Sequence, residues 1–274
     1  MFARIPLLAF LVAVGLAAQF KDGPFPAHKV IGNVYYVGSQ QLASYLITTP
    51  QGHILINSSF EETVPLIQSS VEKLGFKFGD IKILLTSHAH ADHVAGNARV
   101  KELTGAKVMV MQGDEELVRS GGENDFQYSS RWKPCQVDRV LHDLEEVKLD
   151  GVTLTAHLTP GHTRGCTTWT LPVSEGGKTY QVVIVGSPNV NPGYRLVNNA
   201  KYPQIADDFA RTFRVLKALP CDVFLGAHGA YYGLEDKYKK LQQGGANPFI
   251  DPAGYRSFVK TKEQEYERKL AAQK

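Results

Sequence analysis

Four potential metal ligands lie within six consecutive residues, and they are His88, His90, Asp92 and His93. Three neutral imidazoles and one carboxylate form a mixed nitrogen and oxygen donor set, which suits zinc better than calcium or magnesium. The alternative interpretation is a solvated polar loop that is rich in histidine by chance. We favour the metal centre because the rest of the chain supplies further ligands of the same type.

Two more histidines, His162 and His228, each follow a predicted strand and stand beside glycine in a turn. Loops at strand ends are where a rigid scaffold presents its functional side chains. Catalytic zinc takes about three protein ligands and keeps a position open for water or substrate. Six candidate ligands therefore make two such sites, and the histidines outside them are interpreted as structural: His28, His53, His142 and His157.

The predicted elements explain how the clustered ligands could converge. Residues 81–85 predict a short apolar strand that ends just before the cluster, and residues 94–103 predict a helix directly after it. Because an extended segment directs residues i and i+2 to one side, His88 and His90 should point the same way. The turn that follows could then direct the other two ligands of the cluster towards a neighbouring point.

The remaining pattern predicts two groups of strands with flanking helices, and so two sheets packed face to face and covered by helices. The polar stretch 113–134, which contains Phe126, Tyr128 and Trp132, is long for a connection, and loops of that kind often cover active sites. The patterns predict strands at 30–31, 33–37, 44–48, 53–57, 107–111, 152–158, 166–171, 180–185 and 222–225, and helices at 61–74, 204–218 and from 254 onward.

The composition predicts one large globular domain. The chain has 274 residues, 43% of them hydrophobic, and has neither a linker nor an internal repeat. The net charge of +3 is too small to indicate nucleic acid or an anionic membrane as a partner. The cysteines Cys135, Cys166 and Cys221 form no Cys-x-x-Cys pair, so we expect them to be small buried apolar residues.

The N-terminus has the pattern of an export signal. Arg4 precedes an apolar run at 5–16, and small residues suited to cleavage follow that run. A membrane-spanning helix would need about 20 apolar residues, and Gln19 ends the run too early. We therefore expect a signal peptide at 1–18, a mature domain at 19–274 and a soluble periplasmic protein.

Three longer motifs resemble the metallo-β-lactamase superfamily and, within it, subclass B3. They are LTPGHTRGCTTWT at 158–170, NPGY at 191–194 and LPCDV at 219–223, and the similarity extends from about Val30 to the C-terminal region. The resemblance implies a mixed α/β (α+β) fold, the four-layer αββα metallo-β-lactamase sandwich. It also implies which residues would bind each of two zinc ions: His88, His90 and His162 the first, and Asp92, His93 and His228 the second.

One position separates subclass B3 from related hydrolases. Ser187 follows the predicted strand 182–185, where many superfamily members have a bridging aspartate and subclass B1 enzymes have a cysteine ligand. The chain also departs from the family pattern. Asn57 ends a strand where many members have aspartate, and Asn189 replaces a serine that in some members helps hold the substrate carboxylate. No cysteine matches the partner that Cys221 would need for the disulfide of some members.

The resemblance implies an exported di-zinc β-lactamase that hydrolyses the lactam amide of penicillins, cephalosporins and carbapenems and confers antibiotic resistance. A zinc-bound hydroxide would attack the lactam carbonyl, with Asp92 orienting it and Tyr194 assisting the oxyanion. Ser187 and Asn189 would hold the substrate carboxylate. We expect a monomer whose partner is a small-molecule β-lactam, with no nucleic acid and no membrane after signal cleavage.

Two alternatives stay open from the sequence. The first is another exported di-zinc hydrolase, acting on a lactone, a thioester or a phosphodiester. The second is a zinc-binding protein without catalysis. Division of six ligands into two sets of three argues against the second alternative, because a storage site has no reason to keep coordination positions open.

Overall fold

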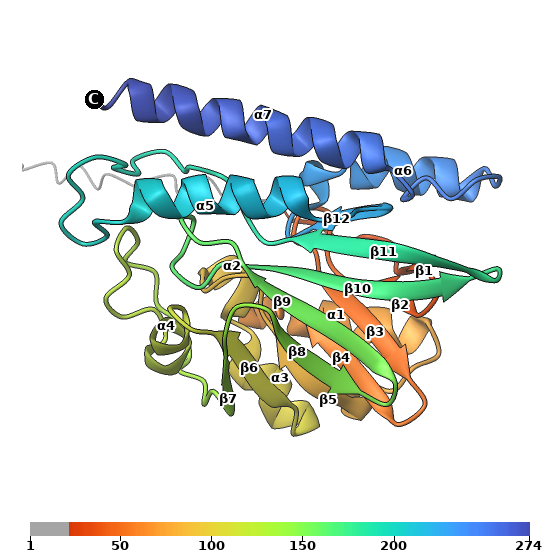
Figure 1. The fold of residues 1–274 in the computed structure, drawn as a ribbon. Coiled ribbons are helices and arrows are strands. Elements are labelled where there is room, and N and C mark those ends of the chain that lie inside the picture. Colours follow the sequence, from red (N-terminus) through yellow and green to blue (C-terminus); the bar gives the residue numbers. More distant parts are fainter. Residues whose placement is uncertain (1–21) are drawn as a thin grey trace, which may run out of the picture.

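The computed structural model describes residues 22–274, and the predicted signal peptide at 1–18 lies outside the described residues. Two β-sheets pack face to face in this part of the chain, and helices cover the outer face of each (Figure 1). None of the described helices combines the length and the apolar character that crossing a bilayer requires.

The first sheet has seven strands, which lie side by side in chain order. Its first four strands are antiparallel, and the pairs from β4 to β7 are parallel. Parallel pairing directs the carboxyl ends of neighbouring strands to one edge, where loops can meet. The strands are β1 (His28–Ile31), β2 (Val34–Tyr36), β3 (Tyr45–Thr49), β4 (Gly52–Ile56), β5 (Ile81–Leu85), β6 (Lys107–Met111) and β7 (Arg139–Leu141).

The second sheet has five strands in the order β12-β11-β10-β9-β8. Its pairs are antiparallel except for β11 with β12, which are parallel. Its strands are β8 (Glu145–Leu149), β9 (Val152–Leu158), β10 (Thr167–Glu175), β11 (Lys178–Val185) and β12 (Val223–Gly226).

Helices form the two outer layers. The helices α1, α3 and α4 pack on the first sheet, and α5 and α7 cover the second (Figure 1). The predicted four-layer αββα sandwich is therefore confirmed. The helices are α1 (Val64–Lys73), α2 (Ala91–Val94), α3 (Asn97–Thr104), α4 (Glu115–Ser120), α5 (Ile205–Ala218), α6 (Leu234–Gln242) and α7 (Pro252–Ala271), with 3-10 turns η1 (Glu61–Thr63), η2 (Phe78–Asp80) and η3 (Gly229–Tyr231).

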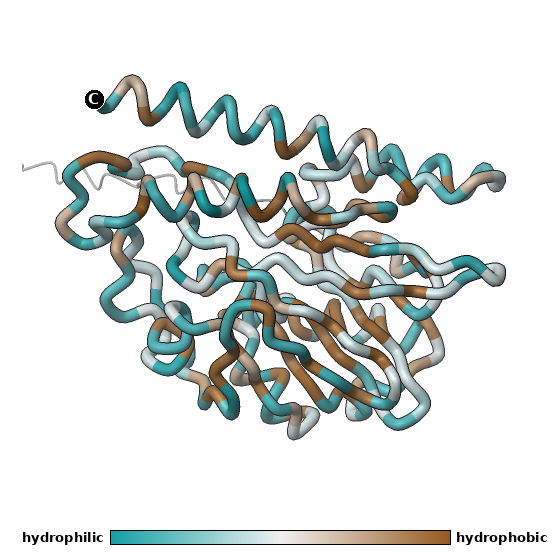
Figure 2. Tube along the Cα trace, in the orientation of Figure 1, coloured by the Kyte–Doolittle hydropathy of each residue, from teal (hydrophilic) through white to brown (hydrophobic). Residues whose placement is uncertain are grey.

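The first sheet is buried on both faces: one face packs on the second sheet and the other on helices. Because successive side chains of a strand point to opposite sides, each strand contributes to both contacts. Ile54 and Ile56 of β4 join the large hydrophobic cluster that also contains Trp169 of the second sheet. Leu55, between them, joins a separate cluster with Val71 of α1. The hydrophobic strand segments inside the molecule are visible as brown stretches in Figure 2. Burial on both faces therefore holds the strand ends of this sheet in fixed positions.

Two buried hydrogen bonds join the sheets near the edge where the candidate ligands lie. The Tyr45 hydroxyl donates to the Gly226 carbonyl at 2.7 Å, two residues before His228. The Trp169 indole donates to the Thr86 carbonyl at 3.0 Å, directly before the histidine cluster. A buried hydrogen bond of this kind fixes the relative position of two backbones, because an unpaired buried carbonyl would be costly.

Several local predictions differ from the structure. The helix expected at 94–103 begins only at Asn97, as α3, because α2 ends at Val94 and the Gly96 N–H donates to the Ser59 carbonyl instead of continuing the helical ladder. The stretch 113–134 contains α4 and is therefore only partly a loop. Strand β8 was not predicted, because it is an edge strand in which only Val147 is buried and charged residues surround it.

Removing the Tyr45 hydroxyl should weaken the contact between the sheets. The Tyr45→Phe variant leaves the buried Gly226 carbonyl without this donor, so we expect a loss of about 1–3 kcal/mol of unfolding free energy. Urea unfolding of the metal-free protein measures this. Tyr35→Phe is the matched control, because the half-buried Tyr35 hydroxyl has no hydrogen bond within residues 22–274. Equal stabilities for the two variants would contradict the assigned contact.

Candidate metal centre

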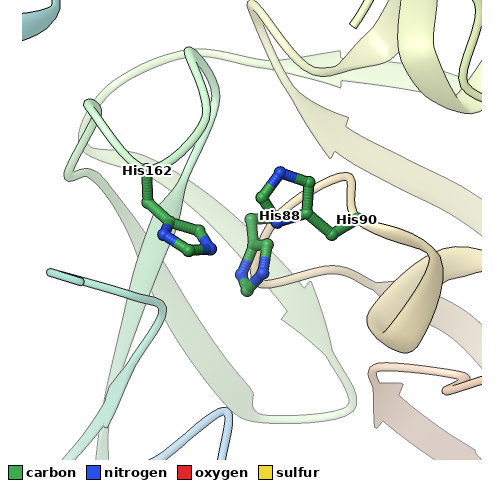
Figure 3. Close-up of side chains that lie close together, drawn as sticks. All are labelled: His88, His90 and His162. Atoms are coloured by element: carbon green, nitrogen blue, oxygen red, sulfur yellow. The ribbon is translucent and has the colours of Figure 1, made fainter. Parts of the chain in front are cut away.

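Three histidines from two loops meet at one edge of the sandwich. His88 and His90 follow β5, and His162 lies in the loop between β9 and β10. One ring nitrogen of each falls within 4.8 Å of the corresponding atoms of the other two. The three rings point towards one another in Figure 3, and their centroids are 4.5–5.0 Å apart. The structure therefore brings His162 next to the two histidines with which the sequence grouped it.

A second set of ligand atoms lies beside the first. Asp92 Oδ2 is 3.3 Å from His93 Nε2 and 3.8 Å from His228 Nε2, and the two imidazole nitrogens are 3.2 Å apart. Ligand atoms of His88 also lie within 4.8 Å of those of Asp92 and His93. His88 therefore stands between the two sets, and all six predicted ligands converge on one place.

The local electrostatics favour metal-binding protonation states. Burial, reinforced by neighbouring histidines, lowers the pKa of His88 and of His162 well below the usual value. Burial and then His93 lower the pKa of His228 to about 4. Burial alone would raise the pKa of Asp92, but attraction to His93 and His228 outweighs it and holds the pKa below the usual range. At neutral pH these imidazoles offer free lone pairs and the carboxylate is ionised.

The donor chemistry of these residues fits zinc. Neutral imidazole nitrogens and a carboxylate oxygen are its usual nitrogen and oxygen ligands, and three-ligand sets leave a position open. The Nε2 atoms of His93 and His228 face each other at 3.2 Å beside a carboxylate oxygen. With both imidazoles in the tautomer that leaves Nε2 unprotonated, one cation can bind these two nitrogens together with the carboxylate.

The first ligand loop is held by an amide side chain. Asn57, at the end of β4, accepts a hydrogen bond at 2.8 Å from the Ser87 backbone N–H through its Oδ1. Its Nδ2 donates to the Ala43 carbonyl at 3.3 Å. Asparagine at the position where many family members have aspartate therefore still supports the loop that carries His88 and His90.

A buried carboxylate joins the two ligand loops. Asp114, 1% exposed, accepts hydrogen bonds through Oδ2 from the Ala89 N–H at 2.8 Å and the Thr163 hydroxyl at 2.7 Å. Its Oδ1 accepts from the Gly165 N–H at 2.8 Å. Burial raises the pKa of Asp114 to about 6, although its three donors favour the ionised form. One side chain thus fixes Ala89, between two ligands, relative to the loop of His162.

His162 is oriented by its own neighbours. Its Nδ1 donates to the Asn189 carbonyl at 2.8 Å, which leaves Nε2 as the nitrogen with a free lone pair. The preceding Gly161 has φ +118°, and a Cβ there would lie 2.7 Å from the Phe209 ring. Both the backbone conformation and the space therefore require glycine.

Tyr194 supports His162 in this structure. Its hydroxyl donates to the His162 carbonyl at 2.8 Å, and the residue is only 3% exposed. Tyr194 is absent from the residues that line the cleft above the two ligand sets. Its expected part in stabilising an oxyanion stays a prediction, and it requires the hydroxyl to leave this hydrogen bond.

Four of the six candidate ligands, His90, Asp92, His162 and His228, line a cleft with a volume of about 570 Å³, which is the size of a small-molecule site, whereas His88 and His93 are buried. Of the predicted substrate-binding residues, Asn189 lines this cleft and Ser187, 1% exposed, lies behind it. Tyr231 lines the cleft, and its hydroxyl contacts both residues: it lies 3.0 Å from Ser187 Oγ and accepts from Asn189 Nδ2 at 2.8 Å.

Sequence reasoning missed Tyr231 and Asp114, whereas it did expect the polar stretch 113–134 to lie over the site. Tyr231 lies only three residues after His228, in η3, and that proximity was the available signal. Tyr128 and Trp132 of the polar stretch line the cleft, whereas Phe126 is buried against Tyr194. Asp114 carries no motif, and only the fold brings it to the loops.

The residues that the sequence left outside the site lie elsewhere. His53 packs against Phe76, and His157 bonds to the Thr170 hydroxyl. All three cysteines are free, with Cys135 and Cys166 buried and Cys221 half-buried.

Comparisons with known proteins agree with this geometry. The family model described as the metallo-beta-lactamase superfamily matches residues 38–172. The FEZ-1 metallo-beta-lactamase from Legionella gormanii is 52% identical, with 92% of this chain and 98% of that chain covered and a TM-score of 0.91. The class B3 di-zinc metallo-beta-lactamase LRA-12 from an Alaskan soil metagenome is 32% identical, with 90% and 94% covered and a TM-score of 0.86.

A curated relative carries a different activity in its name. The hydroxyacylglutathione hydrolase of Hyphomonas neptunium is 26% identical over 132 residues, which are 48% of this chain and 43% of that protein. The chain thus matches less than half the length of this relative, whereas it covers nearly all of the two solved structures. The chain belongs to the metallo-beta-lactamase superfamily of hydrolases, and within it the chain is most like the subclass B3 enzymes.

Proposed function

We propose that this protein is a di-zinc β-lactamase that hydrolyses the lactam amide of penicillins, cephalosporins and carbapenems. The observation that carries the proposal is the convergence of two three-ligand sets on a cleft of small-molecule size. Similarity to FEZ-1 over 98% of that β-lactamase supports the substrate class. The di-zinc description of LRA-12 supports two ions.

His88, His90 and His162 would hold one zinc ion, and Asp92, His93 and His228 the other. Bound zinc would supply Lewis acidity that polarises the lactam carbonyl and activates water for attack at neutral pH. The chain itself supplies the orientation: loops tied by Asp114 fix where the ligand atoms point, and the cleft walls position the drug above them.

Asp92 has a second task in this proposal. Its contacts with His93 and His228 both use Oδ2, so Oδ1 is left to orient the attacking water and accept its proton. The side chain is 30% exposed and lines the cleft, so that oxygen can reach a substrate-side water. A carboxylate with a depressed pKa accepts this proton only transiently, and it can pass the proton to the departing lactam nitrogen.

Ser187, Asn189 and Tyr231 would bind the carboxylate that β-lactam drugs carry. The three side chains form one hydrogen-bonded group, and Tyr231 and Asn189 are its members that line the cleft. We assign the Tyr231 hydroxyl and Asn189 Nδ2 as the donors to the carboxylate, with Ser187 accepting or donating behind Tyr231. Because a hydrogen bond to a charged group is strong, this group would fix the drug in the cleft.

A second candidate is thioester hydrolysis, which the name of the curated relative suggests. The second residue after β11 argues against it. The sequence has Ser187 at a position where many superfamily hydrolases carry a bridging aspartate, so the two zinc ions would lack a shared carboxylate. We therefore rank β-lactam hydrolysis first.

Turnover of nitrocefin, a penicillin and a carbapenem by the zinc-loaded protein tests this function, with a hydroxyacyl-glutathione thioester as competing substrate. We expect hydrolysis of the β-lactams and loss of at least about 100-fold in kcat/KM in His162→Ala, because a zinc ligand is removed. His142→Ala, at an exposed histidine, is the matched control and should match wild type. Fast thioester hydrolysis without β-lactam turnover would reject the proposal.

We also propose that residues 1–18 direct export to the periplasm, where hydrolysis of β-lactams would protect the cell. The proposal rests on the charged start and apolar run of the N-terminus. N-terminal sequencing of protein from a periplasmic fraction should give a mature start near Gln19. Recovery of the chain only in the cytosol, with the N-terminal segment retained, would refute export.

Removing the Tyr231 hydroxyl should weaken substrate binding. We expect Tyr231→Phe to raise KM for nitrocefin about tenfold or more, with kcat little changed, because a hydrogen bond to a charged carboxylate is worth about 1.5–3 kcal/mol. Ser187→Ala should raise KM by less, since Ser187 acts through Tyr231. A fall in kcat at constant KM in either variant would contradict the assigned role.

A further inference from the structure

Each histidine of the first set would bind the metal through one ring nitrogen, and its second ring nitrogen needs another partner. His90 differs from the other two histidines because its second nitrogen has none among the described residues. The Nδ1 atom of His162 donates to the Asn189 carbonyl at 2.8 Å, and Nδ1 of His88 lies 3.3 Å from the Ser87 hydroxyl. The Nε2 atom of His90 is buried and has no hydrogen-bond partner among the described residues. A metal-binding imidazole almost always donates its second N–H to an acceptor, which fixes the ring and its tautomer. His90 therefore lacks a partner that its role requires.

An unpaired carboxylate oxygen lies next to that nitrogen. Asp125 Oδ2 is 4.0 Å from His90 Nε2, and it is also buried without a hydrogen-bond partner in residues 22–274. The Asp125 side chain is only 4% exposed, so solvent cannot satisfy this oxygen. Two complementary buried groups that both lack partners, at this separation, form an incomplete donor–acceptor pair.

The other oxygen of the same carboxylate has a separate task. Asp125 Oδ1 accepts from the backbone N–H groups of Gln127 and Tyr128 at 2.7 and 2.6 Å, which closes a turn in the polar stretch 113–134. This turn fixes the position of the carboxyl group and directs Oδ2 towards His90. The turn alone does not require a charge, because an amide oxygen could accept the same two hydrogen bonds.

We propose that Asp125 is a positioning residue for the metal centre, which accepts a hydrogen bond from His90 Nε2–H when His90 binds the metal through Nδ1. The inference rests on the proposed zinc assignment and adds a residue that the ligand motif does not contain. A charge-assisted hydrogen bond measures about 2.7–2.9 Å, so the two atoms must approach by about 1 Å. A small rotation of the His90 ring towards the carboxylate achieves this.

The same contact links metal binding to a wall of the cleft. Tyr128, whose backbone N–H bonds to Asp125, packs its ring edge-on against His90, with centroids 5.0 Å apart. The Tyr128 hydroxyl accepts from Asn191 Nδ2 at 2.8 Å, across the cleft rim. A metal ion that holds the His90 ring thus also holds the turn, and with it the side chain that faces the substrate.

The Asp125→Asn substitution separates the two tasks of this carboxyl group. The amide oxygen can still close the turn, but the amide nitrogen cannot accept from His90 Nε2–H. We expect a loss of about 10–100-fold in zinc affinity at the weakened site, measured by competition with a chromophoric chelator. The melting temperature of the metal-free variant should equal that of metal-free wild type, which a purely structural role would not permit.

Asp251→Asn is the matched control for the chemical change. Asp251, the N-cap residue of α7, also accepts from a backbone N–H through Oδ1, and its Oδ2 forms an ion pair with the Lys237 ammonium rather than with any of the six candidate ligands. Its zinc affinity should match wild type. A zinc affinity of Asp125→Asn within about twofold of the control would overturn the inference. A metal-free Asp125→Asn protein that melts at a lower temperature than metal-free wild type would overturn it as well.

A measurement on the unaltered protein guards against a variant that fails to fold. In the zinc-loaded wild type, nitrogen-15 NMR should give a downfield His90 Nε2–H proton that exchanges slowly with solvent, as expected for a buried hydrogen bond to a carboxylate. A rapidly exchanging signal would contradict the contact. If wild type binds zinc and hydrolyses β-lactams but lacks the slowly exchanging His90 Nε2–H signal, only the Asp125 contact is refuted. Wild type that binds no zinc refutes both proposals.

Discussion

The hydrogen bonds of the Asp114 carboxylate are the constraint on which the rest of the site depends. The six candidate ligands come from loops of two different sheets, and Asp114 bonds both to Ala89, within the first loop, and to Thr163 and Gly165, beside His162. Each bond to a buried charged group contributes about 1.5–3 kcal/mol, and the fully buried position gives the carboxylate no competing solvent. The sandwich thus fixes ligand geometry through polar contacts at the edge of an otherwise apolar core.

Burial has two opposite effects at this edge, and both favour metal chemistry. It lowers the pKa values of histidines such as His88 and His228, which keeps their lone pairs free, while the neighbouring imidazoles hold Asp92 in its ionised form. The cleft above them is open to a small molecule and lined by both polar and aromatic groups. The result is a donor set that is ready for a cation at neutral pH and a space in which a substrate can reach it.

The αββα fold and the convergence of the six candidate ligands could be predicted from the sequence, because unusual residue types stand at strand ends and the motif around His162 is long. The directions in which the side chains point could not be predicted from the sequence. Tyr194 was expected to assist the oxyanion, yet its hydroxyl bonds to the His162 carbonyl, and the hydroxyl beside Ser187 belongs to Tyr231, which lines the cleft. Asp114 was missed because its partners lie 25 to 51 residues away in sequence, so only tertiary packing reveals its role.

The central claim is that two cations bind at two distinct three-ligand sets. Anomalous X-ray scattering at the zinc absorption edge, on crystals of the zinc-loaded protein, tests it most directly. We predict two peaks about 3.5–4 Å apart, one among His88, His90 and His162 and the other among Asp92, His93 and His228. A single peak, or any peak bound by residues outside these six, would contradict it.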